Sequence, residues 1–123
     1  MLEILPANLE ELEQICEENS LKRNDNTSAI VAKDKLVKIG YCLFDIVNNA
    51  IYIKAISPVN DALLADGLLR SALFYSTEHG CTDAFYTHLV SEEFLEKIGF
   101  IANKETKELK LLKIFDSCDC CKK

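Results

Sequence analysis

Residues 51–80 read IYIKAISPVNDALLADGLLRSALFYSTEHG, and the stretch continues to Phe100 as CTDAFYTHLVSEEFLEKIGF. The run 51–56 is apolar at nearly every position and predicts a buried strand. Pro58 follows it, and proline has no N–H group to donate to a sheet. The sequence therefore predicts that the strand ends before this proline and that the chain leaves the sheet there.

A long helix is predicted directly after the strand. Asn60 or Asp61 is placed to cap its first turn, because short polar side chains accept hydrogen bonds from free helix amides. Apolar residues at positions 64, 68, 72 and 75 recur at helical spacing, and Gly80 is typical of the residue that follows a helix. The apolar run 84–89 then predicts a second strand. Because a helix joins the two strands, we expect them to pair in parallel through a right-handed crossover.

The residues before this stretch predict an antiparallel meander with strands at 28–33, 36–46 and 50–56. Asn48 and Asn49 suit a hairpin turn, because asparagine tolerates positive φ. Gly40 marks a bulge in the middle strand.

Shorter elements are expected at the two ends of the chain. A weak edge strand at 2–5 precedes a helix that Asn8 and Glu11 cap together. After the second strand, Ser91 opens a short helix that Gly99 ends. The last strands are expected at 100–102 and 108–115.

Composition restricts the class of protein. The 123 residues fit one domain, expected over residues 1–116 and followed by a cysteine-rich tail at 117–123. The net charge of −6 argues against the basic face that nucleic-acid binding requires. No apolar run approaches the roughly 18 residues of a membrane-spanning helix, and the N-terminus has no signal-peptide pattern. We therefore expect a cytoplasmic protein with reduced thiols and with neither nucleic acid nor membrane as a partner.

Two segments resemble the GNAT superfamily of acetyl-CoA-dependent N-acetyltransferases. One is Ile56-Ser57-Pro58 followed by the helical run LLRSAL at 68–73, which looks like the family's acetyl-CoA segment. The other is FLEKIGF at 94–100, which looks like the segment that usually ends in Gly-Phe. The resemblance in element order covers nearly the whole chain. It implies an α/β (α+β) fold in which about three helices flank a mixed, mostly antiparallel central sheet.

The resemblance also implies an acetyl-CoA site at the start of the long helix. In the family, the diphosphate lies on amides at this helix N-terminus, where the helix dipole favours an anion. The corresponding cofactor-binding positions here are Ile56, Pro58, Asn60, Asp61, Ala62, Leu63, Leu64 and Ala65. The family's usual pattern of Gln or Arg, then Gly, then Gly or Ala falls on Asn60, Leu63 and Ala65, and only Ala65 matches it. Leu63 adds a side chain where backbone should approach phosphate, and Asp61 adds a negative charge at the positive helix end.

The residues for proton transfer also depart from the family's pattern. Many members use a tyrosine four residues before the Gly-Phe glycine to protonate the departing thiolate, and Leu95 occupies that position here. The frequent glutamate base has no match, because the polar residues of the strand before the long helix are Tyr52 and Lys54. Tyr86 and His88 share a face of the next predicted strand and are the candidate catalytic residues, since a histidine can accept a proton near neutral pH. In the alternative interpretation, Tyr86 packs with its hydroxyl bonded and His88 caps the next helix.

The six cysteines fall into two groups. Cys16, Cys42 and Cys81 lie singly in periodic segments and are interpreted as small buried hydrophobic residues. Three others crowd into the last six residues and are candidate ligands for a soft ion such as zinc: Cys118, Cys120 and Cys121. A structural zinc ion takes four ligands, which a homodimer that pools two tails would supply. A flexible, reduced tail is the alternative.

Two functions therefore stay open from the sequence. The leading prediction is an N-acetyltransferase that moves an acetyl group from acetyl-CoA to the amine of a small molecule or peptide by direct attack. The alternative is a catalytically degenerate member of the fold that serves as a binding or assembly protein, with or without a thiol or metal-binding tail.

Overall fold

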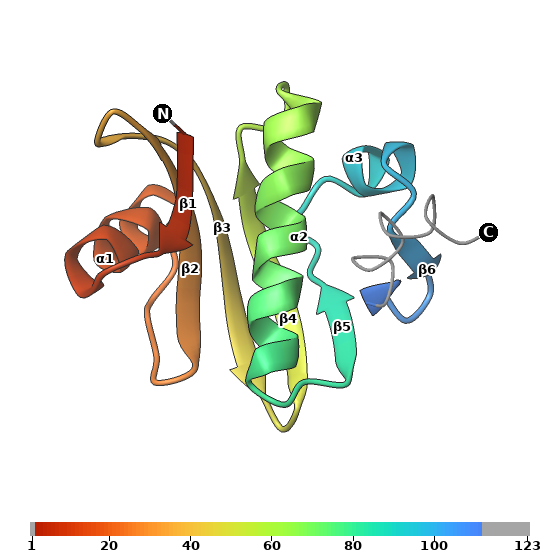
Figure 1. Ribbon diagram of the computed structural model, residues 1–123. Helices are drawn as coiled ribbons and strands as arrows, with labels where there is room; N and C mark the ends of the chain where they lie inside the picture. The colour runs from red at the N-terminus through yellow and green to blue at the C-terminus, as the bar shows by residue number, and fades with distance from the viewer. Residues whose placement is uncertain (1, 112–123) are drawn as a thin grey trace.

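In the computed structural model, which describes residues 2–111, the chain forms a seven-stranded sheet and three helices (Figure 1). The strand order is β1-β2-β3-β4-β5-β7-β6. The strands are β1 (Leu2–Pro6), β2 (Thr27–Asp34), β3 (Val37–Val47), β4 (Ala50–Ser57), β5 (Asp83–Tyr86), β6 (Ile101–Asn103) and β7 (Glu108–Leu109). The helices are α1 (Leu9–Glu18), α2 (Ala62–Glu78) and α3 (Glu92–Lys97).

The sheet is antiparallel except at one place, the parallel pair β4–β5 that α2 connects. This mixed, mostly antiparallel arrangement confirms the predicted fold class and the predicted crossover. Asn48 and Asn49 form the β3–β4 hairpin turn with φ of 51° and 67°, as predicted. The β2–β3 turn is longer than predicted: the sequence predicts that the strand begins at Leu36, but Leu36 belongs to the turn. Lys35 and Leu36 both have positive φ, and β3 begins only at Val37.

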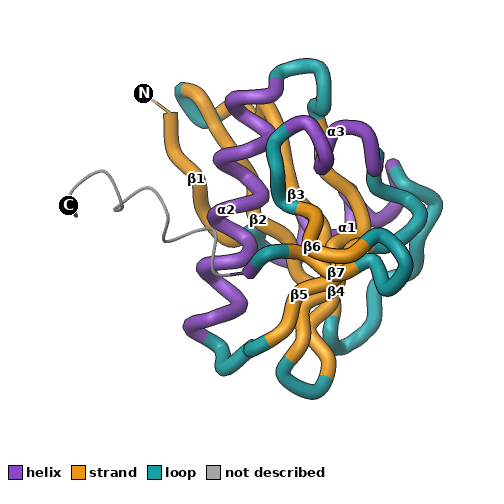
Figure 2. The backbone as a smooth tube through the Cα atoms, turned by 90° about the vertical axis from the view of Figure 1, so that its right-hand side faces the viewer, coloured by secondary structure: helices purple, strands orange, loops and turns teal. Residues whose placement is uncertain are grey.

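The two faces of the sheet carry different helices. Figure 2 shows α2 on one face and α1 on the other. Under α2 lies the larger apolar cluster, which includes the fully buried Phe44, Leu68 and Phe100. Under α1 lies a smaller cluster that includes Ile15 and Leu43. Because α2 is buried along its predicted apolar stripe, burial of that stripe accounts for its position.

The helix ends follow the local sequence signals. Asn8 and Glu11 form the predicted capping box, with bonds of 2.8 Å and 3.0 Å between each side chain and the other residue's amide. Asp61 caps α2 and Ser91 caps α3. Gly80 has φ of +86° just after α2, a conformation that glycine adopts without strain.

Two bulges interrupt the meander. In β3, Ile39 has no partner in β2, next to the predicted position Gly40. In β4, Lys54 has no partner in β3, a bulge that the sequence pattern did not reveal. Gly40 faces the β4–α2 connection closely: a Cβ atom there would lie 2.8 Å from the Ser57 carbonyl oxygen and 3.1 Å from Pro58 Cδ. The β4–α2 connection therefore packs against bare backbone.

Two predicted strands were too long. The strand predicted at 84–89 ends at Tyr86, because the chain then turns toward α3. The strand predicted at 108–115 covers only Glu108–Leu109 up to residue 111, and the rest lies outside the described residues. Within residues 2–111, none of the helices has the length and apolar character needed to span a bilayer.

Candidate functional site

β4 and β5 separate part of the way along their length. They pair over Ala50–Ile53 and Asp83–Tyr86 only. The Thr87 amide makes one further bond, donating to the Ile53 carbonyl oxygen at 3.0 Å. Within residues 2–111, the remaining β4 segment, 54–57, has no strand beside it on this edge. An extended ligand with amide groups can pair with such a free strand edge.

A cavity of about 350 Å³ lies beyond this free segment, between the start of α2 and α3. Its lining comes from the β4–α2 connection and from α3: Val59, Asn60, Ala62, Ser91, Glu93, Phe94 and Lys97. Lys97 is exposed in the last turn of α3 and supplies the positive charge of this lining. The charge of Lys97 is offset by the Glu93 carboxylate in the same lining, so the feature of the cavity that favours an anion is the N-terminus of α2.

The first turn of α2 has both occupied and free amides. The Asp61 carboxylate accepts a hydrogen bond from the Leu64 amide at 3.2 Å, and the Ala65 amide donates to the Asp61 carbonyl oxygen at 2.9 Å. The amides of Ala62 and Leu63 donate to no group among residues 2–111. Two N–H groups thus stay available for a ligand oxygen.

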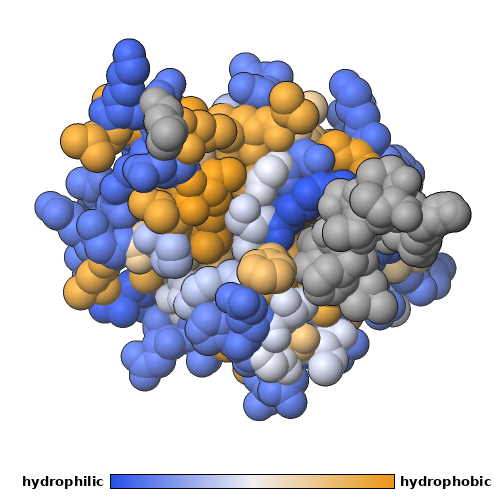
Figure 3. All heavy atoms as spheres, in the orientation of Figure 1, coloured by the Kyte–Doolittle hydropathy of each residue, from blue (hydrophilic) through white to orange (hydrophobic). Residues whose placement is uncertain are grey.

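The predicted cofactor residues divide between two sides of the α2 N-terminus. Asn60 and Ala62 line the α3-side cavity. Asp61, Leu63 and Leu64 instead line a second cavity of about 340 Å³ on the β1 side, where apolar side chains gather beside α2 in Figure 3. The Leu63 side chain is 84% exposed there. We therefore do not expect it to block a phosphate on the α3 side.

The other three predicted cofactor positions have structural roles. Ile56 and Ala65 are buried in the core under α2. Pro58 is half-buried and faces Gly40. These residues shape the β4–α2 connection, and a contact of their side chains with a ligand stays a prediction.

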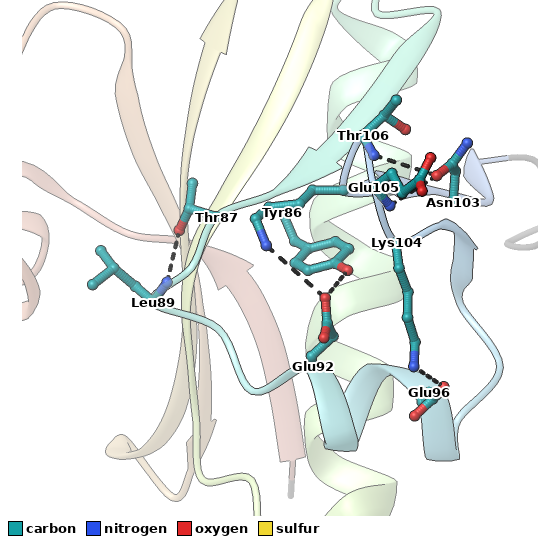
Figure 4. A network of polar contacts seen from close by, with 10 residues as sticks. Tyr86, Thr87, Leu89, Glu92, Glu96, Asn103, Lys104, Glu105 and Thr106 are labelled. Atoms are coloured by element: carbon teal, nitrogen blue, oxygen red, sulfur yellow. Dashed lines mark hydrogen bonds and ion pairs between the residues drawn. The ribbon is translucent and has the colours of Figure 1, made fainter.

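Tyr86 is buried and bonded. Its hydroxyl donates to the Glu92 carboxylate at 2.6 Å (Figure 4). The Lys107 ammonium lies 5.3 Å from its ring centre. Burial, followed by the hydrogen bond to Glu92, raises the pKa of the hydroxyl to about 12. Lys104 and Glu96 form an ion pair beside it, between the β6–β7 turn and α3. This network fixes α3 against β5, and it favours a positioning role for Tyr86.

His88 lies apart from Tyr86. It is exposed in the turn after β5, so the two side chains do not share a strand face as predicted. Ser91, rather than His88, caps α3. Leu95, at the position of the family's tyrosine, is fully buried in the core. Of the two candidate catalytic residues, only His88 therefore has a side chain that solvent reaches.

Two groups of residues at the site have no signal in the family resemblance. Lys97 was not predicted as a site residue, and the signal that could have found it is its place as the one cationic residue of the FLEKIGF segment. The bulged Lys54 forms an ion pair with Asp45 at 3.1 Å, and the Thr27 hydroxyl donates to the same carboxylate at 2.8 Å. These three residues come from three strands, so no local signal joins them.

The structure contains no cluster of three or more metal-ligating side chains within residues 2–111. The candidate ligands Cys118, Cys120 and Cys121 lie outside this range, and a zinc site there stays a prediction. Cys16, Cys42 and Cys81 are buried free thiols, as predicted. Burial raises the pKa of the Cys42 thiol, which keeps it protonated.

No protein-family model matches this chain, and no curated protein matches it. Solved structures do match it. A ribosomal-protein-alanine N-acetyltransferase from Brucella melitensis biovar Abortus 2308 is 11% identical with a TM-score of 0.64, over 84% of this chain and 94% of that one. The aminoglycoside N-acetyltransferase AAC(6')-Iy in complex with CoA is 15% identical with a TM-score of 0.61, over 85% and 90%.

A transcriptional regulator from Bacillus halodurans C-125 is also similar, at 17% identity and a TM-score of 0.58, over 84% of this chain and 95% of that one. Several of the matching structures carry the GNAT or acetyltransferase name. The chain therefore has the fold of the GNAT acetyltransferases, as its resemblance implied.

Proposed function

We propose that this protein transfers an acetyl group from acetyl-CoA to an amine. The observation that carries the proposal is the free β4 segment 54–57, which leads directly to the cavity at the α2 N-terminus. The pantetheine amides would pair with the free strand edge. The diphosphate would lie in the cavity against the Ala62 and Leu63 amides, with Lys97 beside it.

The reaction balances as a direct displacement. The amine nitrogen attacks the thioester carbonyl carbon, an N–C bond forms, and the C–S bond breaks. The amine loses a proton, for which exposed His88 is the proposed acceptor, directly or through water. The CoA thiolate leaves and takes a proton from solvent, because Leu95 supplies no hydroxyl and Tyr86 donates its own to Glu92. Holding the two substrates together accounts for most of the proposed rate gain.

We expect acetyl-CoA to stabilise the protein. A ligand at 100 times its Kd adds about 2.7 kcal/mol to the free energy of unfolding. Thermal unfolding should therefore shift upward with millimolar CoA or acetyl-CoA, and not with the same concentration of chloride. The absence of a shift with either CoA compound would refute the proposed cofactor site.

The two charged residues near the α2 N-terminus, Lys97 and Asp61, should have opposite effects on the affinity for CoA. We expect Lys97→Met to raise the Kd about twofold to fivefold, because an exposed charge contact is lost. Asp61→Asn should lower the Kd about twofold to fivefold, because the amide still caps the helix while the repelling charge is gone.

Isothermal titration at low salt measures both changes. The matched controls are Lys22→Met and Asp25→Asn, in the exposed loop after α1, which should leave the Kd unchanged. Equal effects of the site and control variants would point to net charge alone and would count against this cavity as the diphosphate site.

The second candidate function is a non-catalytic binding protein that keeps the fold. The buried Leu95 favours it, because the chain lacks the family's acid at that position. The two candidates separate in one assay that follows release of free CoA thiol in the presence of a panel of amines. Binding of CoA without any amine-dependent release would favour the binding protein.

A further inference from the structure

Five side chains form a row across the sheet. The strand registers place one from each of β2, β3, β4, β5 and β7 in it: Thr27, Asp45, Tyr52, Phe85 and Glu108. Paired residues of neighbouring strands point to the same face of a sheet. The row therefore presents a hydroxyl and a carboxylate, then two aromatic rings, then a second carboxylate.

The row faces away from α2. Residues adjacent to it along the strands, such as Ile53, Tyr86 and Leu109, belong to the core under α2. Alternation along a strand then directs the row to the opposite face. Tyr52 has 36% of its surface exposed, and Phe85 and Glu108 are half-buried, so solvent reaches this part of the row.

The two rings stand face to face. Their centres are 5.3 Å apart and their planes differ by 17°. Neighbouring strands lie about 4.8 Å apart, so the rings stack along the direction that runs across the strands. One face of the Phe85 ring therefore meets Tyr52, and the other face looks toward β7, where Glu108 is the paired residue.

The two carboxylates of the row differ in their partners. Asp45 is neutralised by Lys54 at 3.1 Å and accepts from Thr27. Glu108 forms no ion pair or side-chain hydrogen bond with the described part of the chain. A half-buried carboxylate and a half-buried aromatic ring are thus paired across β5 and β7, and both groups attract a cation.

We propose that Phe85 and Glu108 bind the acceptor as a protonated alkylamine, with its ammonium group between the ring and the carboxylate. The assignment of this ligand as the acceptor rests on the proposed function. The row lies one residue before the last β4–β5 pair, Ile53–Tyr86, where the strands separate. An amine bound there lies beside the end of the free edge at which the thioester would be held. An ammonium nitrogen has no lone pair, so it gives one proton to water or to His88 before it attacks, and the nitrogen loses its second proton after the N–C bond forms. We therefore expect the protein to bind cationic amines more tightly than neutral or anionic ones.

Amine binding is tested first without CoA. The ¹⁵N-labelled protein is titrated with n-butylamine at pH 7, and with n-butanol as the neutral probe, while amide chemical shifts are followed. We expect butylammonium to shift the amides of β5 and β7 around Phe85 and Glu108, and n-butanol to leave them unchanged. Equal shifts with both probes, or shifts elsewhere only, would overturn the proposal.

Two variants then measure separately how much the Phe85 ring and the Glu108 charge contribute to amine binding. Glu108→Gln and Phe85→Leu should each raise the butylammonium Kd about twofold to fivefold. Glu105→Gln, in the exposed β6–β7 turn, changes the same charge outside the row and should have no effect. If Glu108→Gln and Glu105→Gln weaken butylammonium binding equally, the amine responds to the net charge of the protein, and the assignment of Glu108 as its binding residue fails. Thermal unfolding checks that each variant is folded.

Kinetics distinguish this inference from the proposed function. If acetyl transfer occurs, the two row variants should raise the KM for the amine and leave the KM for acetyl-CoA unchanged. Transfer with an unchanged amine KM would overturn the row as the acceptor site and leave the N-acetyltransferase standing. If CoA neither binds nor reacts, the acetyltransferase fails, and the shifts in the CoA-free titration still decide whether the row binds amines.

Discussion

Replacing Gly40 with alanine is expected to lower the free energy of unfolding by about 1–3 kcal/mol, because the added methyl group overpacks a closed site. The Cβ atom would lie 2.8 Å from the Ser57 carbonyl oxygen, 3.0 Å from Leu68 Cδ1 and 3.1 Å from Pro58 Cδ. The first contact is with backbone, which cannot move away by a rotamer change. Urea denaturation measures the loss.

The matched control for this substitution is Gly67→Ala in α2. A Cβ atom at position 67 meets only Ile4 Cδ1, at an ordinary 3.9 Å. Alanine there should raise stability by about 0.5–1 kcal/mol, because glycine is unfavourable inside a helix. If both variants stabilise the protein, the close packing of the β4–α2 connection on Gly40 is wrong. A Gly40 variant that stays folded should also bind CoA more weakly, because the connection carries the proposed diphosphate site.

Replacing Tyr86 with phenylalanine is expected to cost about 1.5–3 kcal/mol at neutral pH, the usual contribution of a hydrogen bond to a charged partner. The lost bond is the 2.6 Å contact with Glu92 that fixes α3 to β5. The same substitution should change the dependence of stability on alkaline pH. The pKa of the hydroxyl is raised from 10.0 to about 12 in the folded protein.

The raised pKa determines the sign of that dependence. Below pH 10 both the folded and unfolded states keep the proton, and the stabilisation is complete. As the pH rises from 10 toward 12, the unfolded state loses the proton first, so stability falls by about 1.4 kcal/mol per pH unit. Urea denaturation at a series of pH values should show this fall in the wild type and a weaker one in Tyr86→Phe. Tyr52→Phe, at a residue with 36% of its surface exposed, is the control and should retain the wild-type slope.

Much of the fold follows from signals that act over three or four residues. Asn8 with Glu11, Asp61, Ser91 and Gly80 set the helix ends where the sequence predicted them. These signals work because a cap or turn closes its hydrogen bonds within one helical turn. Leu36 shows the limit of such local signals. Its apolar side chain predicts that it belongs to the strand, although the tight turn requires positive φ at this position.

The candidate site was predicted less completely. The sequence located the β4–α2 connection as the cofactor region, since the family resemblance lies there. It did not show that Asn60 and Leu63 face opposite sides of the helix start, because that depends on how α2 lies between β1 and α3. It also predicted a shared strand face for Tyr86 and His88, and the early end of β5 removed His88 from that face.

The sequence by itself determined the order of the elements, their caps and the parallel crossover, because each depends on residues close together in the chain. Only the tertiary structure decided which side chains meet across the sheet. The row that includes Tyr52, Phe85 and Glu108 exists because of the strand register, and the bulge at Ile39 shifts the β2–β3 register between the turn and the pair Thr27–Asp45. A shift of one residue would turn a strand's side chains to the other face. No local pattern specifies such a row, because its successive members lie between 7 and 33 residues apart along the chain.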